Sequence, residues 1–125
     1  SQFIVTEKQN SLILDAYNAN PSSMLESIQS FDRISYDKKL VILGDMLELG
    51  KESTTEHQHL IEMIEANQLD AILIGHEFNQ CKHGFKQFLN TEDCLQWIQE
   101  KPITKTFILL KGSRGIKLEQ LRPFL

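Results

Sequence analysis

The sequence is poor in the residues that mark disulfide-rich, fibrous and membrane proteins. Its 125 residues include 2 cysteines, 6 glycines and 3 prolines. Cys81 and Cys94 cannot make a disulfide framework, which indicates a reducing compartment, so we expect a cytoplasmic protein. No apolar run approaches the ~18 residues of a membrane span. The N-terminus lacks the basic-then-apolar pattern of a signal peptide, and we therefore expect no membrane insertion.

Positive charge is also scarce. The 13 Lys and Arg residues are scattered and are outnumbered by 17 Asp and Glu residues, so the net charge is −4. A nucleic-acid-binding face usually needs a basic patch, so we expect no nucleic acid partner. The composition, 41% hydrophobic and 24% charged, is that of a globular protein. A chain of this length buries roughly two thirds of its unfolded surface. We expect residues 1–125 to form a single domain.

Short apolar runs predict the strands. Each run is too short for a helix and ends in a turn signal, and continuous apolar character is typical of parallel strands that are buried on both faces. The four strong runs are residues 12–14, 40–43, 71–74 and 107–110. Two weaker candidates, residues 3–5 and 85–89, are expected at the edges of the sheet.

Helical patterns lie between these runs. Asn20 and Pro21 predict the N-cap and first residue of a helix. Its expected buried face consists of Met24, Leu25, Ile28 and Phe31. Residues 53–56, Ser-Thr-Thr-Glu, read as a capping box that opens a second helix. The buried face expected there consists of Leu60, Ile61 and Ile64. A third helix follows Asn90 or Thr91 and must end near Pro102, and residues 118–121 predict a short last helix.

The alternation of strands and helices predicts an α/β fold. We expect a Rossmann-like three-layer domain with a mostly parallel sheet of about six strands and helices on both faces. Ligands in such open sheets bind beyond the carboxyl ends of the strands. The polar segments that follow the apolar runs are therefore the candidate sites. They are residues 15–20, 44–48, 75–76 and 111–115.

The first candidate segment begins with Asp15. A carboxylate at a strand end can accept two hydrogen bonds from a vicinal diol, as acidic groups of nucleotide-binding folds do from ribose. Tyr17 offers a flat apolar face and Asn18 an amide, which together suit a purine ring. The alternative is that Asp15 and Asn20 cap a turn and that Tyr17 packs, because short motifs alone are weak.

The second candidate segment follows residues 40–43. Gly44 permits close backbone approach or a positive φ. The carboxylates of Asp45 and Glu48 could hold a metal, orient a lysine or bind an amine. The alternative is a solvated loop with Leu47 and Leu49 packed onto the core.

The third candidate segment, residues 111–115, suits an anion. Arg114 can grip a carboxylate or phosphate through two hydrogen bonds, Lys111 adds a point charge and Ser113 a hydroxyl. The alternative is a basic surface turn. The spacing of a P-loop occurs nowhere in the chain.

His57 and His59 stand two apart on a helix and do not share a face, so a zinc site is not expected.

Three strings taken together are far more specific than any one. They are LDAYNANPSSM at residues 14–24, LGDMLELG at residues 43–50 and LKGSRG at residues 110–115. In order and spacing these strings resemble the C-terminal domain of the Mur ligases, and residues 53–57 also look like that family. The resemblance covers nearly the whole chain. The Tyr-Asn-Ala-Asn-Pro string resembles the members that join D-alanyl-D-alanine to UDP-N-acetylmuramoyl-tripeptide in peptidoglycan synthesis.

The resemblance implies a three-domain enzyme. In that family the first domain binds the UDP-sugar, and the central domain carries the ATP P-loop, the magnesium ligands and a carbamylated lysine. The third domain is Rossmann-like and closes over the other two, which excludes water from an acyl-phosphate intermediate. ATP and Mg would therefore be held mainly by the central domain. By this resemblance the chain is a fragment, and we expect it to be catalytically inert alone, because phosphoryl transfer needs a phosphate cradle and a metal.

The resemblance also implies roles for particular residues. Asp15 would contact the nucleotide, with Tyr17, Asn18 and Pro21 near the adenine or ribose. The substrate carboxylate would lie toward Lys111, Ser113 and Arg114, with Asp45 in the same group. Further candidates for the cleft, with no role implied, are Asn20, Met46, Glu48 and His57. The family's hinge arginine, which contacts ATP phosphate, lies before the point where this sequence begins.

Other functions fit some of the same features. A phospho-receiver domain has this length and fold class, but Asp15 stands alone where that class needs an acidic pair, and Gly75 stands where a Ser or Thr would follow the strand. Phosphotransfer to Asp45 would distinguish the two. A non-catalytic interaction module predicts a large exposed apolar patch, and another Mur-type or folate-type ligase is a further alternative. The ligase interpretation requires the turns at residues 15–18 and 111–114 to open onto one rim.

Overall fold

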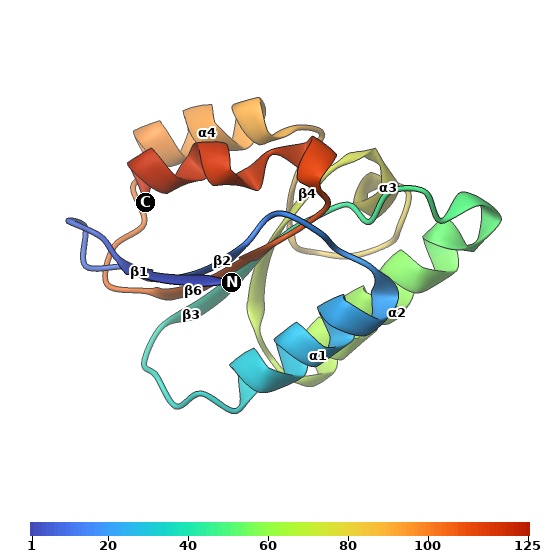
Figure 1. The fold of residues 1–125 in the computed structure, drawn as a ribbon, viewed down its shortest axis with the longest axis horizontal. Helices are drawn as coiled ribbons and strands as arrows, with labels where there is room; N and C mark the ends of the chain where they lie inside the picture. The colour runs from blue at the N-terminus through green and yellow to red at the C-terminus, as the bar shows by residue number, and fades with distance from the viewer.

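The computed structural model describes residues 1–125 and contains one six-stranded sheet between two layers of helices (Figure 1). The strands are β1 (Gln2–Val5), β2 (Ser11–Asp15), β3 (Lys39–Gly44), β4 (Asp70–Ile74), β5 (Lys86–Phe88) and β6 (Phe107–Lys111). Their order in the sheet is β1-β2-β6-β3-β4-β5. Only β1 runs antiparallel to its neighbour. All six predicted strands are confirmed, with the two weaker ones at the edges.

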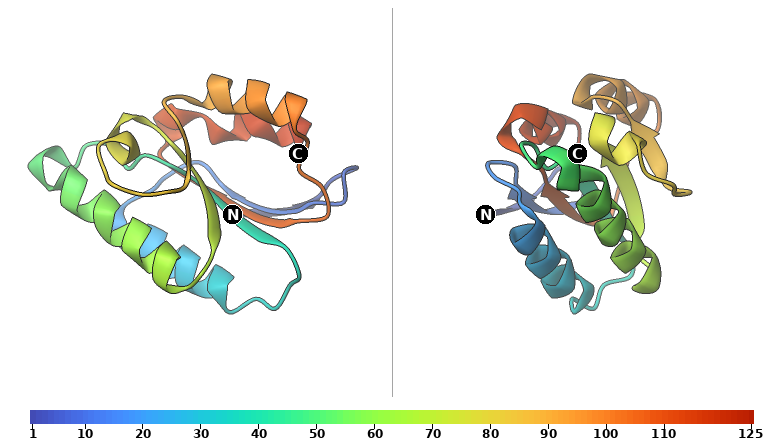
Figure 2. Two further views of the ribbon diagram at one scale, coloured as in Figure 1. Left: turned by 180° about the vertical axis from the view of Figure 1, so that it is seen from behind. Right: turned by 90° about the vertical axis from the view of Figure 1, so that its right-hand side faces the viewer.

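Helices cover both faces of the sheet, as the alternation predicts. The α-helices are α1 (Pro21–Asp32), α2 (Ser53–Ala66), α3 (His76–Asn79) and α4 (Thr91–Glu100), and the 3-10 helices are η1 (Gly50–Glu52), η2 (Arg114–Ile116) and η3 (Leu118–Phe124). Helices α1 and α2 lie on one face, whereas α4 and the C-terminal η3 lie on the other (Figures 1 and 2). None of the helices combines the length and the apolar character that crossing a membrane requires.

The core has two halves, one on each face of the sheet. Phe31 of α1, Ile61 of α2 and Phe78 of α3 pack with Leu73 and neighbouring strand residues on the first face. Cys94, Ile98, Leu118 and Leu121 pack with Leu12, Ile42 and Ile108 on the second face. The central strands are buried from both sides, which explains their continuous apolar sequences.

Helix α1 begins as predicted. Asn20 is its N-cap, the Asn20 side chain accepts a hydrogen bond from the Ser23 amide at 2.9 Å, and Pro21 is the first helical residue. The prediction for Leu25 is wrong, because this side chain is 42% exposed. The buried stripe contains Met24, Ile28 and Phe31, and Leu25 lies one residue, about 100°, around the helix from Met24.

The predicted capping box at the start of α2 is also wrong. Residues 50–52 already form the turn η1, so Ser53 has helical dihedral angles and is not an N-cap. The Ser53 hydroxyl instead donates to the Glu77 carboxylate. The third helix is confirmed with Asn90 as its N-cap. The short helix α3 was not predicted, since its four residues are too few to show a period.

A buried asparagine joins three distant segments at the amino end of the sheet. The Asn10 amide nitrogen donates to the carbonyls of Ile103 at 2.7 Å and Leu125 at 2.6 Å, and its oxygen accepts from the Thr106 amide at 3.0 Å. The side chain is fully buried and all three of these hydrogen bonds are internal. Asn10 thus ties the β1–β2 hairpin to the segment before β6 and to the C-terminal residue.

Candidate functional site

The carboxyl ends of the parallel strands bring the first and third candidate segments together. Asp15 at the end of β2 is in register with Lys111 at the end of β6, and Lys111 is also in register with Leu43 near the end of β3. The turns at residues 15–18 and 111–114 therefore open onto one edge of the sheet. We call this edge the rim.

A salt bridge forms the centre of the rim. The Lys111 ammonium donates to Asp15 Oδ2 at 2.6 Å and to the carbonyl of Asn18 at 3.3 Å. The Lys111 side chain is 3% exposed and that of Asp15 is 25% exposed. The other carboxylate oxygen of Asp15, Oδ1, has no hydrogen-bond partner in the chain. Asp15 therefore keeps one open acceptor, whereas the Lys111 ammonium is already occupied.

An aromatic ring and a guanidinium project from the two turns. Tyr17 is 73% exposed, so its ring does not pack into the core. The Arg114 guanidinium lies over this ring, 5.1 Å from its centroid, in a cation–π contact. Asn18 is exposed beside Tyr17, and Asn20 and Pro21 are occupied with the start of α1. The rim thus offers a flat π-face and a planar cation to a ligand.

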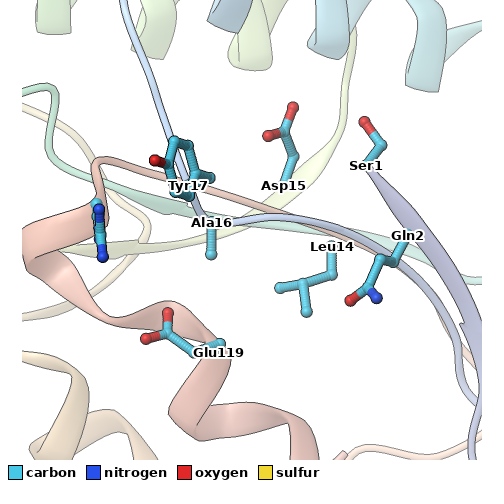
Figure 3. Close-up of a pocket in the computed structure, with 8 residues that line it drawn as sticks. Ser1, Gln2, Leu14, Asp15, Ala16, Tyr17 and Glu119 are labelled. Carbon is cyan, nitrogen blue, oxygen red and sulfur yellow. The ribbon is translucent and has the colours of Figure 1, made fainter.

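Two hollows meet at Asp15. One, of about 350 Å³, is lined by Tyr17, Arg114 and Glu119 together with Leu14 and Ala16 (Figure 3). The other, of about 370 Å³, lies against α1 and is lined by Lys111 and by α1 side chains that include Ser23 and Ser27. In Figure 3 the Asp15 carboxylate and the Leu14 side chain point to opposite sides of the strand. Asp15 therefore borders two hollows, one lined by Arg114 and the Tyr17 ring and the other by Lys111 and the serine hydroxyls of α1.

Glycines allow β3 and β6 to approach closely behind the rim. A β-carbon on Gly112 would lie 2.8 Å from the Cα of Gly44, and a β-carbon on Gly44 would lie 2.8 Å from Ile116. Neither glycine has a positive φ. Of the two reasons predicted for Gly44, close backbone approach is the one that the structure confirms.

The second candidate segment is turned inward. Asp45 is 2% exposed, and its two carboxylate oxygens accept hydrogen bonds from the amides of Glu77 at 2.9 Å and Phe78 at 3.0 Å. Burial raises the pKa of the Asp45 carboxyl above its usual 3.8, and the two amide hydrogen bonds offset part of that shift. The Asp45 side chain therefore holds the start of α3 and does not face a ligand. Its burial also makes it a poor phosphate acceptor, against the phospho-receiver alternative.

His57 supports the same loop from α2. The ring is fully buried, its Nε2 accepts from the Met46 amide at 3.0 Å, and its Nδ1 donates to the Ser53 carbonyl at 2.7 Å. Since Nε2 is an acceptor, His57 is the neutral Nδ1–H tautomer. Its Nε2 lies 3.9 Å from an oxygen of Asp45, beyond hydrogen-bond distance, so the two are neighbours and not an ion pair.

The other predicted cleft residues have separate places. Met46 is fully buried in the core, and Glu48 is exposed with a φ of 66° in the loop before η1. Ser113 is nearly buried, and its hydroxyl accepts from the Leu47 amide at 2.9 Å, which fixes the β6–η2 turn to the β3 loop. Ser113 thus fixes the backbone of the turn next to Arg114. Glu119, which lines the Tyr17 hollow, was missed because nothing in the sequence marks its position.

Neither a metal site nor a reactive thiol is present. No group of three or more His, Cys, Asp and Glu side chains is arranged to hold a metal ion. Burial raises the pKa of Cys94 to about 12 and also raises that of Cys81, so neither thiol is a nucleophile at neutral pH. What the rim can do chemically is bind: it can accept hydrogen bonds, stack on a ring and pair with an anion.

The fold and the rim define the class of protein as a Rossmann-like α/β domain whose candidate site lies at the carboxyl edge of its sheet. Residues 2–114 match the family model described as Mur ligase, glutamate ligase domain. The chain therefore belongs to the Mur ligase family, and it corresponds to that domain.

Curated relatives resemble the chain along nearly its whole length. A Bacillus subtilis protein named UDP-N-acetylmuramoyl-tripeptide–D-alanyl-D-alanine ligase is 34% identical over 96% of this chain, and 29% of the relative is covered. The Escherichia coli protein of the same name is 32% identical over 95% of this chain and 28% of the relative. The chain thus spans less than a third of the length of these relatives.

Solved structures agree with the fold. A crystal structure of MurF from Acinetobacter baumannii is 27% identical with a TM-score of 0.75, and the match covers 98% of this chain and 28% of that one. The MurF ligase of Thermotoga maritima, solved in complex with ADP, has a TM-score of 0.79 at 21% identity, with 98% of this chain and 29% of that one covered. The second match supports the fold alone.

Proposed function

We propose that this chain is the C-terminal domain of an ADP-forming ligase that adds D-alanyl-D-alanine to UDP-N-acetylmuramoyl-tripeptide through an acyl phosphate. The observation that carries the proposal is the likeness along 96% of the chain to a Bacillus subtilis ligase of that name. The rim supports it, because the residues shared with the family's Asp-x-Tyr-Asn and Lys-Gly-Ser-Arg strings lie together at one edge.

The domain acts as a lid that brings a ribose contact and an anion contact to the reacting groups. Asp15 accepts from the ribose hydroxyls through its open Oδ1, and Tyr17 and Asn18 lie against the adenine, with Pro21 setting the end of the turn. Arg114 pairs with the substrate carboxylate, since its planar guanidinium matches a carboxylate. The partner of the lid is the central ATPase domain of the same polypeptide.

ATP and magnesium are divided unequally between the domains. The open Asp15 oxygen and the exposed Tyr17 ring fit a nucleoside. The chain has neither a P-loop nor a cluster of metal-binding side chains. The triphosphate and Mg are therefore held by the central domain, and a ligase of this type works in the cytoplasm, where ATP is present.

The test compares the isolated chain with the full ligase that carries it. We expect the full ligase to release ADP only when UDP-N-acetylmuramoyl-tripeptide and D-alanyl-D-alanine are both present, and the isolated chain to release none. A full ligase that prefers a single amino acid to the dipeptide would assign the chain to another branch of the family. Turnover by residues 1–125 alone would refute the lid role.

A further inference from the structure

We propose that Lys111 is a positioning residue that acts on the nucleotide through Asp15, and that it does not bind the acid group of a substrate. The inference rests on the proposed function, because it concerns which substrate each rim residue serves. It separates two cations, Lys111 and Arg114, that the sequence places in a single anion site.

The contacts of the Lys111 ammonium leave little for a ligand. Two of its three N–H donors are directed to Asp15 Oδ2 at 2.6 Å and to the Asn18 carbonyl at 3.3 Å, and the side chain is 3% exposed. If the ammonium moved to a substrate, the partly buried Asp15 carboxylate would lose its cation, and removing one partner of such an ion pair is unfavourable. Arg114, in contrast, has no carboxylate partner in the chain.

The strand alternation places Lys111 on the far side of the rim from Arg114. On β6, Leu109 points into the core beneath α1, and Lys111, two residues later, lies on the same face. Lys111 accordingly lines the hollow against α1 and is absent from the hollow lined by Tyr17 and Arg114. The two cations thus approach Asp15 and Tyr17 from different sides.

Two consequences follow for the nucleotide contact. The ion pair fixes the rotamer of Asp15, with Oδ2 on the lysine and Oδ1 left as the acceptor. The bond to the Asn18 carbonyl holds the turn that carries Tyr17. Loss of Lys111 should therefore resemble loss of Asp15 and weaken nucleotide binding, with the peptide substrates unaffected.

The experiment is a double-mutant cycle in the full ligase, with Lys111→Met, Asp15→Asn and the pair. Steady-state ADP release gives KM for ATP, for the tripeptide precursor and for the dipeptide. We expect each single variant to raise KM for ATP about tenfold. The double variant should also show about tenfold, because the second change removes nothing further. The other two KM values should change less than about twofold, since no contact to those substrates is lost.

A rise of KM for the tripeptide or dipeptide in Lys111→Met, or additive effects near a hundredfold in the pair, would overturn the inference. If the methionine variant does not fold, Lys111→Arg is used instead, because it keeps the charge and changes its geometry. Lys111→Arg must then raise KM for ATP and leave KM for the tripeptide precursor and for the dipeptide unchanged. A wild-type ligase that does not use these substrates refutes the proposed function separately. Calorimetric titration of the same variants with ATP alone then tests the role of Lys111. Weaker ATP binding in Lys111→Met and Asp15→Asn supports that role, and unchanged ATP binding in Lys111→Met overturns it.

Discussion

Gly75 and Asp45 follow neighbouring parallel strands, and the glycine leaves the space that the aspartate carboxylate fills. A β-carbon built on Gly75 would overlap that carboxylate, and Gly75 has a φ of 132°, which side-chain-bearing residues rarely adopt. We predict that Gly75→Ala lowers the free energy of unfolding by at least ~3 kcal/mol, measured by urea denaturation. Gly84→Ala, at an exposed position with open space around it, is the control and should change stability by less than ~1 kcal/mol. Equal effects of the two changes would show that the Asp45 carboxylate does not pack closely against Gly75.

The stability that Asp45 contributes should depend on pH. Burial raises the pKa of this carboxyl in the folded protein above 3.8, so the unfolded chain releases the proton at lower pH than the folded protein does. The contribution is therefore fully present below about pH 3.8 and is lost as the pH rises through the folded-state pKa. We predict that the free energy of unfolding of the wild type, minus that of Asp45→Asn, falls across this range and then levels off. A difference that grows with pH would contradict the assigned direction.

Asn10 should be required for stability although it lies far from the rim. Asn10→Ala removes three internal hydrogen bonds and leaves the Ile103 carbonyl and the Thr106 amide without a partner, which costs about 2–4 kcal/mol. The Leu125 carbonyl keeps its hydrogen bond from the Thr6 hydroxyl at 2.7 Å. Asn10→Asp places an oxygen against two carbonyl oxygens and should be at least as damaging. The exposed Asn79, replaced by Ala, is the control and should change the free energy of unfolding by less than ~0.5 kcal/mol. A thermal denaturation series measures all three variants. An Asn10→Ala variant as stable as the control would show that the Asn10 side-chain hydrogen bonds do not stabilise the fold.

The sequence predicts the elements well where local chemistry determines them. The strands follow from apolar runs that are buried on two faces, and the start of α1 follows from Asn20 and Pro21, which act within one turn. The predicted capping box at Ser53 is wrong because the 3-10 turn before Ser53 already continues into the helix. A capping motif in the sequence does not reveal whether the preceding residues are helical.

The site is less predictable, because its contacts join residues far apart in the chain. The pairing of Asp15 with Lys111 depends on the register between β2 and β6, which are separated by most of the sequence. The burial of Asp45 depends on α3, a helix too short to predict. The first and third family strings do meet at one rim, as the ligase interpretation requires, whereas the second is turned inward. The resemblance does not show which side chains are already paired inside the domain.

Tyr17 and Tyr36 should separate function from stability. Tyr17 is largely exposed on the rim, so Tyr17→Ala in the full ligase should raise KM for ATP several-fold and leave the unfolding midpoint nearly unchanged. Tyr36 lies at the other end of the sheet and packs edge-on against Phe107, with 5.3 Å between ring centroids. Tyr36→Ala should lower the midpoint and leave KM for ATP unchanged. A Tyr17→Ala variant with a lower unfolding midpoint and an unchanged KM for ATP would show that Tyr17 does not contact the nucleotide.

Photolabelling tests the nucleotide contact most directly. The full ligase is irradiated with an azidoadenosine triphosphate, digested and mapped by mass spectrometry, with and without excess ATP. The account predicts a labelled peptide that contains Tyr17, and that excess ATP abolishes this label. Labelling confined to the rest of the ligase, or a Tyr17 label that persists in excess ATP, would contradict it.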